Sequence, residues 1–177
     1  SATFTSTGSA ACVLSNEKSD IRVESATLGR IIDFEQNDVN DMGRVMAPSA
    51  IDTLKRHFED TGRDPDYYDL IITGDLGYIG KEILAELAET KGYNINANYD
   101  DCGVLIFDKQ KQDTHSGGSG CACIGTVFSG YFFKQLKEKK VNIICLIITI
   151  TMVIIEVSQL FIPILSLILP EEKVKAY

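Results

Sequence analysis

The segment Thr73–Gly80 (TGDLGYIG) combines glycines with one acidic residue and follows a short apolar run, a position typical of ligand-binding loops in α/β proteins. Its glycines follow the spacing G-x-x-G-x-x-G, whereas a dinucleotide-binding loop has G-x-G-x-x-G, so the match to that motif is weak. A tight turn between a strand and a helix explains Gly77 and Gly80 better. Asp75 either caps the next helix or orients a ligand group. The candidate ligand contacts of this loop are Gly74, Asp75 and Leu76.

Two neighbouring carboxylates, Asp100 and Asp101, mark a second candidate loop, Tyr99–Gly103. Adjacent carboxylates can divide the roles of general acid and general base between them. Neighbours on an extended strand point to opposite faces, however, so we expect at most one of the two to face a pocket. Cys102 has no nearby base that would activate it as a nucleophile, and a small buried residue is the simpler interpretation. Asp101 and Cys102 are the candidate ligand contacts of this loop.

Glycine is concentrated in the third loop, Ser116–Cys123 (SGGSGCAC), which precedes a predicted helix. Glycines allow close approach to the backbone, and the start of a helix offers N–H donors to an anion. The loop lacks the Lys of a P-loop, and close packing against a neighbouring element explains the glycines equally well. Its C-x-C pair has no second pair to complete a zinc site, so we predict no metal site. The candidate ligand contacts are Gly117, Gly118, Ser119, Gly120 and Cys121.

Apolar strands alternate with amphipathic helices along the sequence and would position these loops. The apolar spacing predicts three helices, at Pro48–Asp60, Gly80–Lys91 and Ala122–Lys139. Continuous apolar runs predict three buried strands, at Asp69–Thr73, Gly103–Phe107 and Ile143–Ile150. β-branched residues on both sides of a polar turn predict a hairpin, formed by Thr3–Leu14 and Ile21–Ile32. The alternation predicts an α/β fold in which helices pack on a mixed sheet.

Charge and hydropathy divide the 177 residues into two regions. Residues 1–140 contain 15 Lys and Arg and 22 Asp and Glu, and they account for most of the net charge of −8. This acidic balance, without long basic runs, predicts no nucleic-acid partner. Val141–Leu169 is predominantly apolar, with Glu156 as its only formal charge, and the polar stretch Glu171–Tyr177 follows it. We therefore predict a globular domain at 1–140 and a separate apolar tail at 141–177.

Five cysteines without a secretory leader indicate free thiols in a reducing compartment. The sequence begins at Ser1 and enters a predicted strand almost at once. We therefore expect a piece of a longer chain.

Six strings follow one another in residues 1–140: TSTGSAACVLS, SATLGRIID, DMGRVMAPSAIDTLKRHFEDTGR, YYDLIITGDLG, DDCGVLIFD and SGGSGCAC. Together they resemble the C-terminal half of the stage V sporulation protein AD family. The resemblance implies the second half of a thiolase-like layered fold, with the N-terminal half missing. It also implies a protein that binds dipicolinic acid, a pyridine dicarboxylate, and that works with the other proteins of the spore dipicolinate-transport set.

The resemblance implies binding rather than catalysis, because Gly74 and Asp75 stand where condensing enzymes have a catalytic His. We accordingly expect no catalytic residue and no cofactor, and leave open Ca²⁺ bound together with dipicolinate. The implied location is the cytoplasm or the periphery of the inner forespore membrane. A homodimer is compatible with the resemblance.

Two other functions stay open from the sequence. A fragment of a thiolase-type acyltransferase would need a nucleophile and a base, but His115, beside the third loop, has no evident partner. A membrane-anchored accessory protein would use Val141–Leu169, but Glu156 and Pro163 interrupt the span of about 20 apolar residues that a helix needs. The family pattern also breaks after Lys140, which a shift of reading frame would explain.

Overall fold

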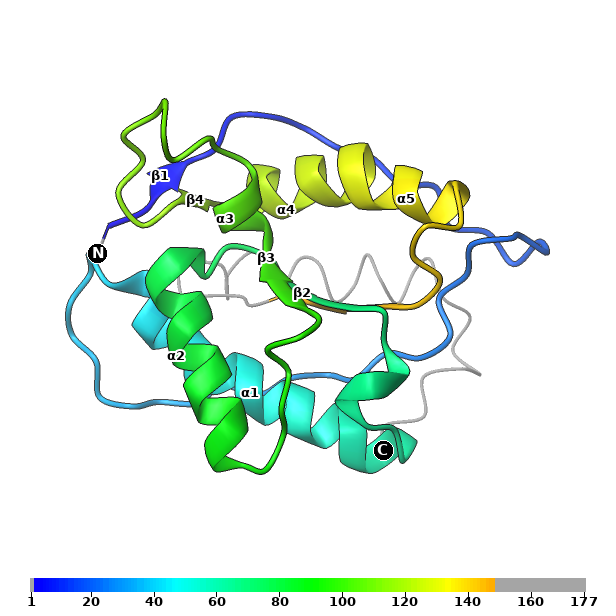
Figure 1. Cartoon of the computed structure of the whole chain (residues 1–177), viewed down its shortest axis with the longest axis horizontal. Coiled ribbons are helices and arrows are strands. Elements are labelled where there is room, and N and C mark those ends of the chain that lie inside the picture. Colours follow the sequence, from blue (N-terminus) through cyan, green and yellow to red (C-terminus); the bar gives the residue numbers. More distant parts are fainter. Residues whose placement is uncertain (1, 149–177) are drawn as a thin grey trace.

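The computed structural model describes residues 2–148, and these form a small parallel sheet between two layers of helices (Figure 1). The central strand β2 (Leu70–Thr73) pairs in parallel with β3 (Tyr99–Asp101) on one side and β5 (Ile144–Ile147) on the other. In register, Thr73 lies beside Asp101 and Ile147. All three strands therefore end at the same edge of the sheet, which is where an α/β fold presents its binding loops.

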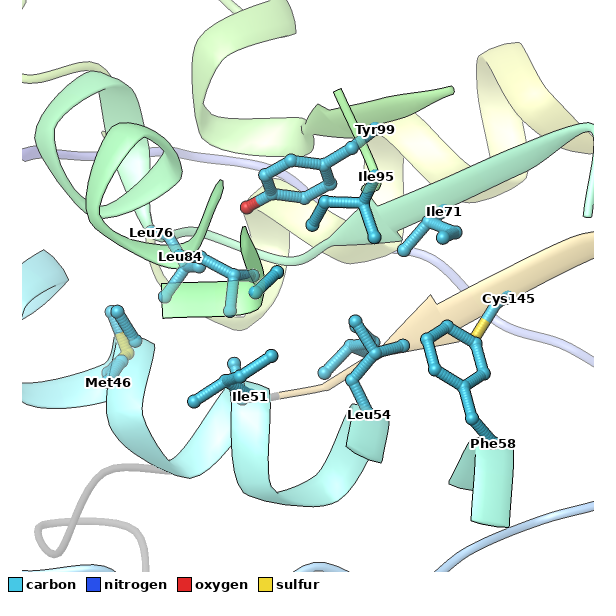
Figure 2. Close-up of a cluster of buried hydrophobic side chains, with 14 of the residues drawn as sticks. Met46, Ile51, Leu54, Phe58, Ile71, Leu76, Leu84, Ile95, Tyr99 and Cys145 are labelled. Carbon is cyan, nitrogen blue, oxygen red and sulfur yellow. The ribbon is translucent and has the colours of Figure 1, made fainter. Parts of the chain in front are cut away.

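Side chains alternate between the two faces of this sheet, as the pleat of a strand requires. Ile71 and Cys145 belong to a core that helices α1 (Met42–Thr61) and α2 (Gly77–Thr90) cover, and Figure 2 shows α1 directing Met46, Ile51 and other apolar side chains into it. Ile72 belongs to a second, smaller core on the opposite face. Both faces of the sheet are therefore covered, which explains why its strands are continuous apolar runs.

The second core is covered by one continuous helical stretch that the sequence predicts well. It consists of α4 (Cys121–Val127), a π-helical turn η2 (Phe128–Phe132) and α5 (Phe133–Lys137). The prediction of a helix at Ala122–Lys139 is confirmed. A single π-helical turn does not change the spacing of apolar residues in a recognisable way, so the sequence did not predict it.

The first two predicted helices are confirmed, but both begin earlier than predicted. The sequence placed Pro48 in the first helical turn, whereas α1 begins at Met42 and contains Pro48. Burial of apolar side chains ahead of the proline, such as Met46, offsets the backbone hydrogen bond that a proline inside a helix cannot make. The end of α1 is as expected, because Gly62 adopts the left-handed conformation, with φ of 64°.

Two predicted strand regions are wrong. Residues 103–107 do not form a strand: β3 ends at Asp101, and Cys102–Leu105 forms the single helical turn α3. The side chain of Asp101 accepts a hydrogen bond from the N–H of Val104 and so caps that turn. A short apolar run such as GVLIF is compatible with either structure, and the cap selects the turn.

The hairpin predicted at Thr3–Leu14 and Ile21–Ile32 is also absent from the described residues. Only β1 (Phe4–Thr5) is a strand, and it pairs in parallel with β4 (Gly118–Ser119) rather than with 21–32. Val13 and Val23 are largely exposed. A β-branched run becomes a strand only where another strand pairs with it, and within residues 2–148 no strand pairs with 21–32. Named strands pair only in parallel here, so the predicted mixed sheet is a parallel one.

The prediction of a strand at Ile143–Ile150 is confirmed by β5, although residues 149 and 150 lie outside the described residues. The 3₁₀ turn η1 (Pro65–Tyr67) leads from α1 into β2. Most of the predicted apolar tail, residues 149–177, also lies outside the described part of the chain. Among residues 2–148, no helix combines the length and apolar character that a membrane crossing requires.

Helices α1 and α2 pack through two glycines, and we expect substitution of one of them to be costly. A Cβ on Gly80 would lie 2.7 Å from Cα of Gly43 and 2.8 Å from Cβ of Leu76. Because backbone cannot move aside as a flexible side chain does, Gly80→Ala should lower the free energy of unfolding by about 2 kcal/mol, despite the helix propensity of alanine. Urea denaturation measures this. Gly130→Ala is the control, since its Cβ would point into open space, and equal stability of both variants would contradict the prediction.

Candidate functional site: three loops joined by two carboxylates

The three loops singled out in the sequence meet at the carboxyl edge of the sheet. Asp101 joins the first two: its Oδ2 accepts hydrogen bonds from Thr73 Oγ1 at 2.6 Å and Leu76 N at 2.9 Å. Its Oδ1 accepts from Gly77 N at 2.9 Å and Val104 N at 3.2 Å. Asp101 is completely buried, so these four donors replace the water that an ionised carboxylate would otherwise bind.

Asp101 also anchors a buried chain of hydroxyl groups. Thr73 donates to Asp101, and the Tyr99 hydroxyl lies 2.9 Å from Thr73 Oγ1, so Tyr99 donates to Thr73. Burial raises the pKa of Asp101 to about 6, although the hydrogen bonds from Thr73, Leu76 and Gly77 act in the opposite direction. Sequence reasoning did not single out Thr73 or Tyr99. Thr73 is the last residue of β2, at the edge where the loops begin, whereas Tyr99 is the first residue of β3 and pairs in register with Ile71. A strand position of this kind could have drawn attention to Thr73 but not to Tyr99.

Asp75 joins the first loop to the third. Its Oδ2 accepts a hydrogen bond from Gly120 N at 2.8 Å. Burial raises the pKa of Asp75, and the Gly120 N–H lowers it. Of the two roles considered from the sequence, Asp75 does not cap α2, whose first residues receive no side-chain bond from it. It holds the glycine loop in place.

Glycines let the three loop backbones touch one another. A Cβ on Gly77 would collide with the carbonyl oxygen of Ser116, and one on Gly103 with that of Gly118. Gly77 and Gly117 also have positive φ angles, of 68° and 106°, which other residues rarely adopt. The backbone N–H of Tyr78 donates to the Ser116 carbonyl at 2.7 Å. From the sequence, close packing and anion binding explained the glycines of the third loop equally well. The contacts in the structure show that close packing is sufficient to explain them.

The cysteines of the loops differ in exposure. Cys102 is buried, and burial raises its pKa well above the ordinary value. Cys123 is also buried, and burial raises its pKa to about 12, so both thiols are protonated at neutral pH. Cys121 is exposed at the start of α4. Within the described residues, no three or more His, Cys, Asp or Glu side chains form a group that could hold a metal ion.

A calcium ion would need oxygen ligands with free lone pairs facing a common space. Both carboxylate oxygens of Asp101 already accept two hydrogen bonds each, and the side chain is buried. The residues of the three loops therefore do not fit a calcium site centred on Asp101. The hydrogen bonds of Asp101 instead hold the first two loops together.

A depression of about 310 Å³ lies beside the joined loops. Residues of α2, β3 and α3 and the preceding loop line it: Tyr78, Lys81, Glu82, Ala85, Asn96, Tyr99 and Val104. The Lys81 ammonium pairs with Asp100 Oδ1 at 2.8 Å at its rim. Asp100 therefore points away from Asp101 and toward the surface, which agrees with the expectation that at most one of the two faces inward. Lys81 was not singled out from the sequence, where a lysine in a helical first turn carries no distinctive signal.

The fold and the joined loops define this chain as an α/β protein whose glycine-rich loops gather at the carboxyl edge of a parallel sheet. Comparison with known proteins then gives the family: the sequence model of stage V sporulation protein AD matches residues 1–160. The stage V sporulation protein AD of Bacillus subtilis (strain 168) is 45% identical over 148 residues, which is 84% of this chain and 44% of that protein. The chain belongs to the stage V sporulation protein AD family and spans less than half the length of this relative.

The family match bears on the predicted division of the chain. It extends to residue 160, past the position where the sequence suggested a break in the family pattern. In the structure, Cys145 and Ile147 of β5 are buried in the main core. Residues 141–148 are thus part of the sheet layer, whereas the rest of the predicted tail lies outside the described residues.

Proposed function

We propose that this chain is the C-terminal half of a thiolase-like, non-catalytic protein that binds dipicolinic acid and takes part in its uptake into the developing spore. The observation that carries the proposal is family membership, at 45% identity across most of the chain. The proposed partners are dipicolinic acid, the N-terminal half and the other proteins of the spore dipicolinate-transport set. The proposed location is cytoplasmic or peripheral at the inner forespore membrane.

The chemistry of the loops supports binding over catalysis. A thiol nucleophile reacts as the thiolate, but burial raises the pKa values of Cys102 and Cys123 far from neutrality. His57, in α1, lies within hydrogen-bond distance of Thr27 and Tyr68, neither of which belongs to the three loops. His115 is exposed and lies 3.5 Å from Asp113. None of these groups forms a nucleophile paired with a base.

The loop geometry supports different roles for the carboxylates, which position the loops, and for the glycine-rich backbone, which is free to approach a ligand. Dipicolinate carries two carboxylates, so a binding loop should offer N–H donors and keep its own carboxylates occupied. Asp75 and Asp101 are occupied by the backbone N–H groups of the loops. The N–H groups of Gly117 and Gly120 already donate to the Thr114 carbonyl and to Asp75. We propose that the remaining backbone N–H groups of Gly117–Cys121 contribute donors to the ligand and that the two carboxylates hold this backbone in position.

A pair of glycine variants tests this role. A Cβ on Gly118 would lie 2.8 Å from Ser6 Oγ and would also press on Ile106, so Gly118→Ala should displace the third loop. We expect its dipicolinate dissociation constant to rise about tenfold or more, the loss of roughly one good hydrogen bond. Isothermal titration calorimetry measures the constant in this chain paired with its N-terminal half, or in a full-length relative at the equivalent position.

Gly130→Ala is the matched control, since its Cβ would point into open space, and its affinity should equal that of the wild type. Circular dichroism at the titration temperature confirms that both variants are folded. Wild-type affinity in Gly118→Ala would place the ligand outside this loop. No heat of binding in the wild type would refute the proposed function itself.

A further inference from the structure

The charge of the chain is strongly segregated. Residues 1–133 contain 11 Lys and Arg and 21 Asp and Glu, a net charge of −10. The next seven residues, 134–140, contain four lysines and one acid, a net charge of +3. The lysines are Lys134, Lys137, Lys139 and Lys140, and we call them the lysine cluster.

The chain turns so that the lysine cluster gathers at one end of the molecule, where α5 ends (Figure 1). Lys139 adopts the left-handed conformation, with φ of 55°, and the N–H of Lys140 donates to the carbonyl of Gln135 at 3.0 Å. This is the hydrogen bond of a Schellman turn, which folds the chain back against the last turn of a helix. Lysines separated in sequence are thereby brought close together.

The lysine side chains are available to a partner. Those of Lys134 and Lys140 are 73% and 68% exposed. Both contact Glu138, at 3.9 Å and 2.8 Å, but exposed pairs of this kind are weak and exchange readily with other anions. The four lysines lie at the C-terminal end of a helix, where the helix dipole is negative, and this favourable interaction offsets part of the repulsion between them.

Aromatic side chains accompany the lysine cluster. Tyr131, one turn before Lys134, is 55% exposed. The ring of Phe133 lies 5.0 Å from Lys137 Nζ and is half-buried. Lysines beside amphipathic aromatic rings are the composition of a surface that lies in the headgroup region of a membrane.

We propose that the lysine cluster, with Tyr131, is a docking surface for an anionic lipid membrane. The occupant follows from charge complementarity: an anionic membrane attracts the +3 cluster and repels residues 1–133, whose net charge is −10, so the charge segregation also orients the protein. The cluster contains lysine alone, whereas fixed recognition of single phosphate groups favours the fork of arginine. The inference gives a specific surface to the peripheral location proposed above and does not depend on the ligand.

Sedimentation of the full chain with vesicles tests the proposal. We expect partitioning onto vesicles containing about one-third phosphatidylglycerol, little onto phosphatidylcholine alone, and loss of binding as salt rises from about 0.1 M to about 0.5 M. The variant K134Q/K137Q/K139Q/K140Q should partition at least about 50-fold more weakly, because each lysine contributes roughly fivefold at such a surface.

The matched control is K18Q/K55Q/K91Q/K111Q, which removes four lysines elsewhere and has the same net charge and the same apolar tail. It should partition as the wild type does. Equal loss in both variants, or no loss in the first, overturns the docking surface, as does binding of the cluster to DNA or to an acidic polypeptide without vesicle binding. Dipicolinate titration of the same variants should be unchanged, which keeps failure of this surface distinguishable from failure of the proposed function.

Discussion

Replacing Asp101 with alanine is expected to lower the free energy of unfolding by about 3 kcal/mol, and with it to separate the first two loops. The carboxylate accepts four hydrogen bonds, three of them from the backbone N–H groups of Leu76, Gly77 and Val104. Alanine leaves these donors without a partner in a completely buried place, and each unpaired buried donor costs about 1–3 kcal/mol. Removal of the desolvated charge offsets part of that sum.

Urea denaturation at pH 7 measures the change, and Asp100→Ala provides the control. Asp100 is the preceding residue on the same strand, and its pair with Lys81 is partly exposed, with about 30% of each side chain accessible. We expect a loss of less than about 1 kcal/mol for the control. If the two variants proved equally stable, Asp101 would not be the group that holds the loops together.

The sequence predicts the parts of this fold that are governed by local periodicity. The apolar faces of α1 and α2 have regular helical spacing, and the structure confirms both helices. The continuous apolar run of β2 is confirmed as a strand, but the similar run Gly103–Phe107 was assigned wrongly, because a short apolar run is compatible with a strand or a helical turn. The side chain of Asp101, which caps a helical turn there, decides its structure.

The long segment before α1 shows why the predicted hairpin was wrong. Its β-branched residues fit a strand, but a strand needs a partner, and partners are set by tertiary structure rather than by local sequence. Instead, polar contacts attach it to α1: Arg30 forms two hydrogen bonds with Asp52, at 2.9 Å and 2.8 Å, and Thr27 Oγ1 lies 2.8 Å from His57 Nδ1. Pairs so distant in sequence leave no pattern that spacing can reveal.

The three candidate loops were singled out from the sequence, but their arrangement relative to one another was not. Their composition identified them, since glycines and acids beside predicted strands and helices are local features. Which acid binds which loop depends on the parallel register that sets Thr73 beside Asp101. The connection from Asp75 to Gly120 likewise spans 45 positions and had to be seen in three dimensions.

We expect the titration of Asp101 to make a measurable contribution to the pH dependence of the free energy of unfolding. Its pKa is raised to about 6 by burial, above the ordinary value of 3.8, so the folded protein binds a proton more tightly than the unfolded chain does. Between these two values the native state holds more protons, and its stability must therefore fall as pH rises. The contribution is complete below about pH 4 and lost above about pH 6, and the difference of about two pKa units corresponds to about 3 kcal/mol.

Other carboxylates act in the opposite direction, so a comparison is needed to isolate this effect. The pKa of Asp52 is lowered by Arg30 and that of Asp69 by the backbone N–H of Asn142, and both stabilise the fold less as pH falls. Asp101→Asn removes the titrating group, so the stability of the wild type relative to this variant should increase by about 3 kcal/mol from pH 7 to pH 4. Asp75, which also has a raised pKa, titrates in both proteins, and its charge is one of the causes that raise the pKa of Asp101.

Urea denaturation of both proteins across that range measures the difference, and the carboxyl ¹³C shift of Asp101 reports its pKa directly. Together, the two measurements show whether burial or hydrogen bonding has the larger effect on the pKa of Asp101. If the four hydrogen bonds outweighed burial, the pKa would lie below 3.8, and the wild type would instead gain on the variant as pH rises. If burial prevails, Asp101 gains its proton near pH 6, and the loops it joins are held by a carboxyl group whose charge changes close to neutrality.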